Sequence, residues 1–141
     1  MRSARRRARR SAPLVLIVDD DAGVAEAAAE AIGAAGYRTL WVPDGWQALL
    51  ALERELPALL LLDLSLPGMS GSELLRLIRT RPAWSHIPRV IMTGTNDRMI
   101  GVREDAPVFY KPVDLDSLVQ VVELYCDRSR PPLPAISESR G

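Results

Sequence analysis

The chain has 141 residues, of which 48% are apolar and 26% charged, a balance typical of one globular domain with a hydrophobic core. Its longest apolar runs, such as residues 58–62, are too short to cross a bilayer, so we expect no membrane segment. A single cysteine excludes an internal disulfide, and a single histidine argues against a zinc site. The formal charges cancel, but six arginines lie within residues 1–10, so a basic arm is expected to precede an acidic body.

Short apolar runs of the β type alternate along the chain with helical patterns. The predicted strands are residues 14–18, 38–42, 58–62, 89–92 and 108–110. Strands that alternate with helices favour a parallel sheet with helices on both faces. The ligand site of such a sheet lies at the carboxyl ends of its strands.

The predicted helices begin at capping residues and carry apolar stripes. They span residues 22–35, 45–55, 73–80 and 114–125. Their predicted N-caps are Asp21 or Asp20 for the first, Asp44 for the second and Ser72 for the third. In the second helix, Leu49, Leu50 and Leu52 are expected to face the core. Residues 96–104 have only a weak helical pattern, so a helix there is expected to be short, loose or absent.

The predicted strand ends carry Asp19-Asp20-Asp21, Asp63, Thr93-Gly94 and Lys111-Pro112. Oxygen ligands without histidine or cysteine suit a hard cation such as Mg²⁺. Asp63 can attack phosphorus as a carboxylate nucleophile, while Thr93 and Lys111 can bind phosphoryl oxygens. Lys111 is the only lysine in a chain with 17 arginines, which indicates that this position needs a compact point charge.

Four motifs in the chain resemble those of the receiver domain of two-component response regulators. They are LIVDDD (16–21), LDLSLPGMSG (62–71), IMTG (91–94) and YKP (110–112), and they occur in the family's order. The resemblance covers about residues 14–125. It implies a flavodoxin-like, doubly wound α/β fold with a five-stranded parallel sheet in the order 2-1-3-4-5.

The resemblance also implies roles for the residues at the strand ends. Asp63 would accept a phosphoryl group from a histidine kinase or histidine phosphotransfer protein. Mg²⁺ would be held by Asp19, Asp20, Asp63 and the backbone carbonyl of Ser65, with Asp19 acting mainly through a water. Thr93 and Lys111 would bind the phosphoryl group, and a cis Lys111-Pro112 bond is expected. Such a domain is no enzyme beyond assisting its own phosphorylation and dephosphorylation.

The chain departs from the family pattern in two places. Receivers usually carry Tyr or Phe three residues before the lysine, where this chain has Val108. Tyr110 shares a strand face with Val108 and is our candidate replacement for that ring. The segment between Thr93 and Lys111 is also about one helical turn shorter than usual, which disfavours a typical dimer through the fourth helix and fifth strand.

We therefore predict a stand-alone, cytoplasmic response regulator that signals through changed binding of an unidentified protein in trans. Residues 1–12 are predicted to be a disordered Arg-rich arm, 13–126 the receiver domain and 127–141 a flexible tail. The arm is the one segment through which nucleic acid could bind. Two alternatives stay open, a phosphorylation-independent scaffold and a haloacid-dehalogenase-type phosphatase, although the phosphatase would need a second acidic pair at a later strand end.

The remaining aromatic and reactive side chains are given structural roles. Trp41, Trp46 and Trp84 are interpreted as packing residues or partly exposed anchors, because no basic patch lies among them. His86 is expected at the surface, and Cys126 is expected to be inert at the end of the last helix.

Overall fold

The computed structural model describes residues 12–94 and 106–127. Within them, one all-parallel sheet has the strand order β2-β1-β3-β4-β5. The strands are β1 (Leu14–Val18), β2 (Arg38–Val42), β3 (Leu59–Asp63), β4 (Arg89–Thr93) and β5 (Val108–Tyr110). The predicted fold class and strand order are confirmed.

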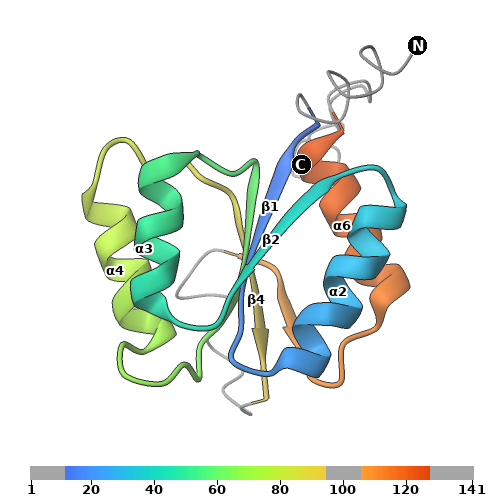
Figure 1. Cartoon of the computed structure of the whole chain (residues 1–141), viewed down its shortest axis with the longest axis horizontal. Coiled ribbons are helices and arrows are strands. Elements are labelled where there is room, and N and C mark those ends of the chain that lie inside the picture. The colour runs from blue at the N-terminus through green and yellow to red at the C-terminus, as the bar shows by residue number, and fades with distance from the viewer. Residues whose placement is uncertain (1–11, 95–105, 128–141) are drawn as a thin grey trace, which may run out of the picture.

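Two layers of helices cover the sheet. The helices are α2 (Ala22–Ala34), α3 (Gly45–Arg54), α4 (Gly71–Thr80) and α6 (Leu115–Cys126). Helices α3 and α4 lie on one face, and α2 and α6 lie on the other (Figure 1). None of the helices in the described part of the chain is long and apolar enough to span a bilayer. The weak helix expected at residues 96–104 lies outside the described residues.

Side chains of the two central strands alternate between two hydrophobic cores. On β1, Leu16 and Val18 join the core under α3 and α4, whereas Val15 and Ile17 join the core under α2 and α6. Every residue of β1 and β3 is buried, because helices cover both faces of these strands. Both strands are therefore packed on two sides along their whole length.

The N-caps of α2 and α3 agree with the sequence, whereas that of α4 does not. Asp21 accepts a hydrogen bond from the Val24 amide at 3.2 Å, and Asp44 accepts one from the Gln47 amide at 2.8 Å. Helix α4 begins at Gly71 rather than Glu73, and Ser70 caps it, so the prediction of Ser72 is wrong.

The reason for the earlier start of α4 is a close contact at Gly71. Its amide donates to the Leu64 carbonyl at 3.0 Å, and a Cβ at this position would lie 2.5 Å from the Leu64 Cα. Only glycine allows the chain to turn into the helix there. The capping pattern Ser70-x-x-Glu73 was the sequence signal for this start.

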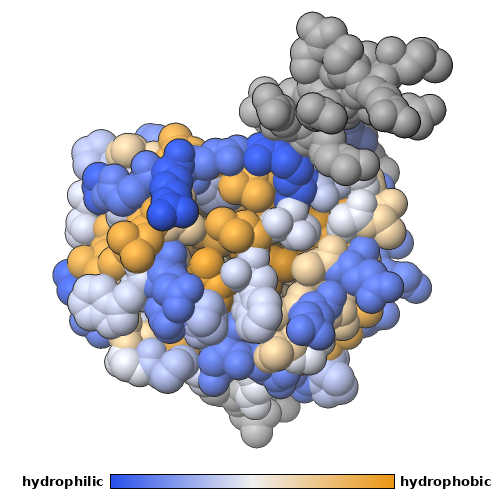
Figure 2. Space-filling view, viewed as in Figure 1, coloured by the Kyte–Doolittle hydropathy of each residue, from blue (hydrophilic) through white to orange (hydrophobic). Residues whose placement is uncertain are grey.

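A second correction concerns Leu50, which is 64% exposed rather than part of the core. The buried stripe of α3 consists of Gly45, Ala48 and Leu52, and Leu50 lies to one side of it. Leu50 and Trp46 instead line an open groove of about 660 Å³ between α3 and α4. Figure 2 shows apolar surface on this side of the molecule.

Candidate functional site

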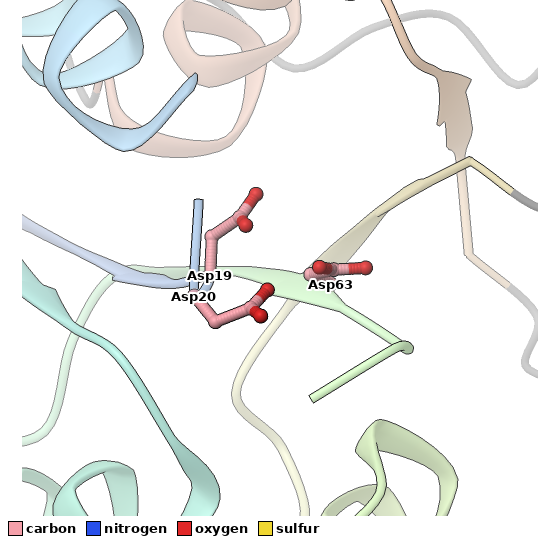
Figure 3. Close-up of side chains that lie close together, drawn as sticks. All are labelled: Asp19, Asp20 and Asp63. Carbon is pink, nitrogen blue, oxygen red and sulfur yellow. The ribbon is translucent and has the colours of Figure 1, made fainter. Parts of the chain in front are cut away.

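Four strand ends bring the predicted site residues together at one edge of the sheet. Asp63 is the last residue of β3 and Thr93 the last of β4, while Asp19-Asp20 and Lys111 directly follow β1 and β5. Strand β3 pairs with both β1 and β4, so these ends are neighbours. Figure 3 shows Asp19 and Asp20 at the end of β1, beside Asp63 on β3.

The three aspartates form a compact cluster. One carboxylate oxygen from each of Asp19, Asp20 and Asp63 lies within 4.8 Å of the others. Asp19 and Asp63 are 0% and 2% exposed, whereas Asp20 is at the surface. The cluster therefore opens to solvent on the side of Asp20.

The Lys111 ammonium joins the two buried carboxylates. Its Nζ donates to Asp19 Oδ1 at 3.2 Å and to Asp63 Oδ2 at 3.2 Å. The Lys111 amide donates to the Thr93 carbonyl at 2.9 Å, which fixes the residue beside the end of β4. The Lys111-Pro112 peptide bond is cis, as the resemblance stated above implies.

Backbone amides orient both buried carboxylates. The amide of Asp21 donates to Asp19 Oδ1 at 2.9 Å, and the amide of Ser65 donates to Asp63 Oδ1 at 3.0 Å. Each is a bond to the residue two positions on, the pattern by which aspartate stabilises a turn. The resemblance to receivers indicates a metal ligand in the carbonyl of Ser65, whereas this role of the Ser65 amide was not predicted.

Burial and charge shift the pKa values of Asp19 and Lys111 in the same direction. Burial raises the pKa of Asp19, and the charge of Asp63 adds to this, although the Asp21 amide and Lys111 offset part of the effect. For Lys111, burial alone would lower the pKa, but the hydrogen bonds and charges of Asp19 and Asp63 together raise it. Lys111 is thus held in its charged form, whereas the hydrogen bonds and charge that Asp19 receives do not fully offset the cost of burying its carboxylate.

The chemistry of the cluster fits a hard divalent cation. Asp19 Oδ2 is buried, and its polar contact within residues 12–94 and 106–127 is the ion pair with Lys111 Nζ at 2.9 Å. The cluster contains three carboxylates, of which the Lys111 ammonium contacts two, and all the candidate ligand atoms are oxygens. Mg²⁺ prefers such ligands and needs only one or two carboxylates from the protein.

Comparison with known proteins decides the family. The model of the response regulator receiver domain matches residues 15–123. The chain belongs to the response regulator receiver family. This receiver is 37% identical over 113 residues to the DNA-binding response regulator MtrA of Mycobacterium tuberculosis, a match that covers 75% of this chain and 48% of MtrA. The chain thus spans about half the length of the MtrA proteins that it matches.

Another relative and two solved structures are similar over most of their length. A Leptolyngbya boryana protein, described only as an uncharacterized 14.6 kDa protein, is 33% identical over 79% of this receiver and 88% of its own length. A putative response regulator from Chloroflexus aurantiacus is 30% identical with a TM-score of 0.77, covering 84% of this chain and all of its own. CheY4 of Vibrio cholerae, at 21% identity and a TM-score of 0.74, covers 82% of this chain and 99% of its own, and shows the shared fold alone.

Two aromatic side chains, Trp41 and Tyr110, lie near the receiver's site. Trp41 donates from Nε1 to the backbone carbonyl of Asp19 at 2.7 Å, a role that its interpretation as a packing residue missed. No sequence signal could have found this bond, because the pairing of β1 with β2 creates it. Tyr110 lies opposite Thr93 in the strand register and is 45% exposed. That Tyr110 replaces the aromatic ring that receivers usually carry at the position of Val108 stays a prediction.

Proposed function

We propose that this receiver accepts a phosphoryl group on Asp63 from a histidine kinase or histidine phosphotransfer protein, in a Mg²⁺-dependent reaction. The observation that carries the proposal is the position of Lys111 Nζ, 3.2 Å from Asp63 Oδ2, in a cluster that opens to solvent beside Asp20. A nucleophilic carboxylate, a cation for phosphoryl oxygens and a place for a metal are thus combined at an accessible edge.

In the proposed step, a carboxylate oxygen of Asp63 forms a bond to phosphorus while the bond from phosphorus to the donor breaks. The electron pair of that bond leaves with the donor's imidazole nitrogen, which is protonated from solvent. Lys111 and the hydroxyl of Thr93 bind phosphoryl oxygens as the new acyl phosphate forms. Mg²⁺ held by Asp19, Asp20, Asp63 and the Ser65 carbonyl would neutralise phosphoryl charge.

The site does not favour the phosphatase alternative. A haloacid-dehalogenase-type enzyme needs a second acidic pair at a later strand end, and β4 ends instead at Thr93, which Gly94 follows. The scaffold alternative predicts that phosphorylation chemistry is irrelevant to partner binding. The contact between the Asp63 and Lys111 side chains is compatible with both functions, so an experiment has to distinguish the scaffold from our proposal.

The proposal is tested by incubating the protein with acetyl phosphate and Mg²⁺ and measuring its intact mass. We expect one phosphoryl adduct that requires Mg²⁺ and is absent from Asp63→Asn. Asp116→Asn, which changes an exposed acid on α6, is the matched control and is expected to form the adduct normally. An adduct that persists in Asp63→Asn, or none in the wild-type protein, would overturn the proposal, and the second result would favour a scaffold.

We further propose that phosphorylation changes the binding of a protein partner in trans, because an added phosphoryl group brings charge and acceptor oxygens to one edge of the sheet. DNA binding is named for MtrA, and this chain spans only about half of that protein.

The receiver domain itself is proposed to comprise residues 13–126. The proposed arm and tail lie almost wholly outside the described residues, and the cytoplasmic location stays a prediction.

A further inference from the structure

The indole of Trp41 reaches from β2 to the turn that carries two of the three clustered aspartates. Its Nε1 donates to the backbone oxygen of Asp19 at 2.7 Å, across 22 positions of sequence. That oxygen belongs to the peptide group that joins Asp19 to Asp20. The indole therefore holds the peptide plane from which the Asp20 backbone continues.

Strand β2 thus binds both backbone groups of Asp19. The amide of Asp19 donates to the Val42 carbonyl at 3.2 Å, and the Asp19 carbonyl accepts the indole N–H. The register of β1 and β2 ends at Val18 and Val42, so the indole extends the contact between these strands by one carbonyl beyond the ladder. The body of the Trp41 ring packs against the core under α2 and α6, which limits its rotation.

The three carboxylates differ in how they are fixed. Asp19 and Asp63 each accept a backbone amide and contact Lys111. Asp20 is exposed, and the contacts within the described residues include no hydrogen bond to its side chain. Its carboxylate nevertheless lies within 4.8 Å of the other two. The position of Asp20 thus depends on its backbone, and the peptide that precedes it is the one bound by Trp41.

We propose that Trp41 is a positioning residue for the cation, one that keeps the Asp20 carboxylate turned toward Asp63 before the metal arrives. This inference rests on the proposed Mg²⁺ site. A site held in its binding geometry loses less conformational freedom when the ion binds, so removal of the N–H weakens affinity without removing a ligand. The reacting groups Asp63, Thr93 and Lys111 keep their own contacts.

The test is Trp41→Phe, which retains an aromatic ring in the core and removes the N–H donor. Titration with MgCl₂ in a calorimeter is expected to give a dissociation constant about three- to tenfold higher than that of the wild-type protein, the range for loss of one hydrogen bond. Phosphorylation by acetyl phosphate at saturating Mg²⁺ is expected to reach the wild-type extent. Trp46→Phe changes an indole on α3 that is 64% exposed, and it is the control with wild-type affinity.

Two further measurements separate positioning from packing. Benzothienylalanine at position 41 replaces the N–H by sulfur in a ring of nearly the same shape, and it is expected to weaken Mg²⁺ binding as Trp41→Phe does. Amide hydrogen exchange at Asp20 and Asp21 is expected to be faster in both variants. Wild-type affinity and exchange in the benzothienylalanine protein would overturn the inference, as would equal losses of affinity, maximal phosphorylation and thermal stability. A wild-type protein that binds no Mg²⁺ would instead overturn the proposed site itself.

Discussion

The contact at Gly71 allows the effect of a single methyl group to be worked out in advance. In Gly71→Ala, the new Cβ would lie 2.5 Å from Leu64 Cα and 2.7 Å from the Asp63 carbonyl oxygen. Both are backbone atoms, so the loop after β3 has to move as a unit. Such overpacking costs about 1–3 kcal/mol, and the lower entropy of an unfolded chain with alanine offsets about 0.4–1 kcal/mol of it.

The net loss of about 1–2 kcal/mol corresponds to a fall in Tm of about 4–10 °C for a domain of this size. Thermal unfolding followed by circular dichroism measures it. Gly33→Ala is the matched control, because Gly33 lies in α2 and a Cβ there meets nothing within 4 Å. The control is expected to be more stable than the wild-type protein by about 0.5–1 kcal/mol.

The displaced backbone adjoins Asp63, so the rate of phosphorylation by acetyl phosphate is also expected to fall in Gly71→Ala and to stay at the wild-type value in Gly33→Ala. Equal stability and equal rates of phosphorylation in the two variants would show that the contact of Gly71 with Leu64 does not exclude a methyl group.

Three further predictions concern the cap of α4, the buried thiol and the departure at β5. In denaturant titrations, Ser70→Ala is expected to lower the free energy of unfolding by about 1 kcal/mol, because the Glu73 amide loses its acceptor. The control Ser72→Ala is expected to change it by less than about 0.5 kcal/mol, and equal effects would contradict the assignment of the cap. Burial raises the pKa of Cys126 to about 11, so its reaction with a disulfide reagent is expected to be slow at pH 8 and fast in denaturant. The rate for the folded protein is expected to rise about tenfold per pH unit up to pH 10. The same shift makes the free energy of unfolding fall as pH rises from the thiol's ordinary pKa through 11. Tyr110→Ala is expected to reduce the NMR shift changes that acetyl phosphate and Mg²⁺ cause around β5, and changes of wild-type size would exclude Tyr110 as the replacement ring.

The sequence could predict the site residues that stand at the ends of strands, because an apolar run followed by a polar residue marks such an end. The apolar runs that end at Asp19 and Asp63 identify two strand ends, and the rule for parallel sheets brings these ends together without further information. Lys111 was identified by its uniqueness and by its position after the last strand, and it does contact both buried carboxylates.

The parts that sequence missed depend on distances between segments. Ser70 and Ser72 are equally good caps as residue types, and the choice between them is made by the contact of Gly71 with Leu64. The exposure of Leu50 has a different origin, because two residues along a helix turn a side chain by about 200°, so Leu50 points away from the buried stripe that contains Ala48 and Leu52. The bond of Trp41 to Asp19 depends on strand register, which apolar periodicity does not determine.

The direction of the strands has a consequence for how this domain can be connected to others. Strand β1 begins, and α6 ends, at the edge of the sheet opposite the carboxyl ends of the strands (Figure 1), and those carboxyl ends carry Asp19, Asp20 and Asp63. Helix α6 starts just after β5 and spans 12 residues, about 18 Å, which returns the chain to that opposite edge. A module or affinity tag fused before β1 or after α6 would therefore attach away from the acidic edge. The domain could in this way be combined with different neighbours while a phosphoryl donor still reaches Asp63.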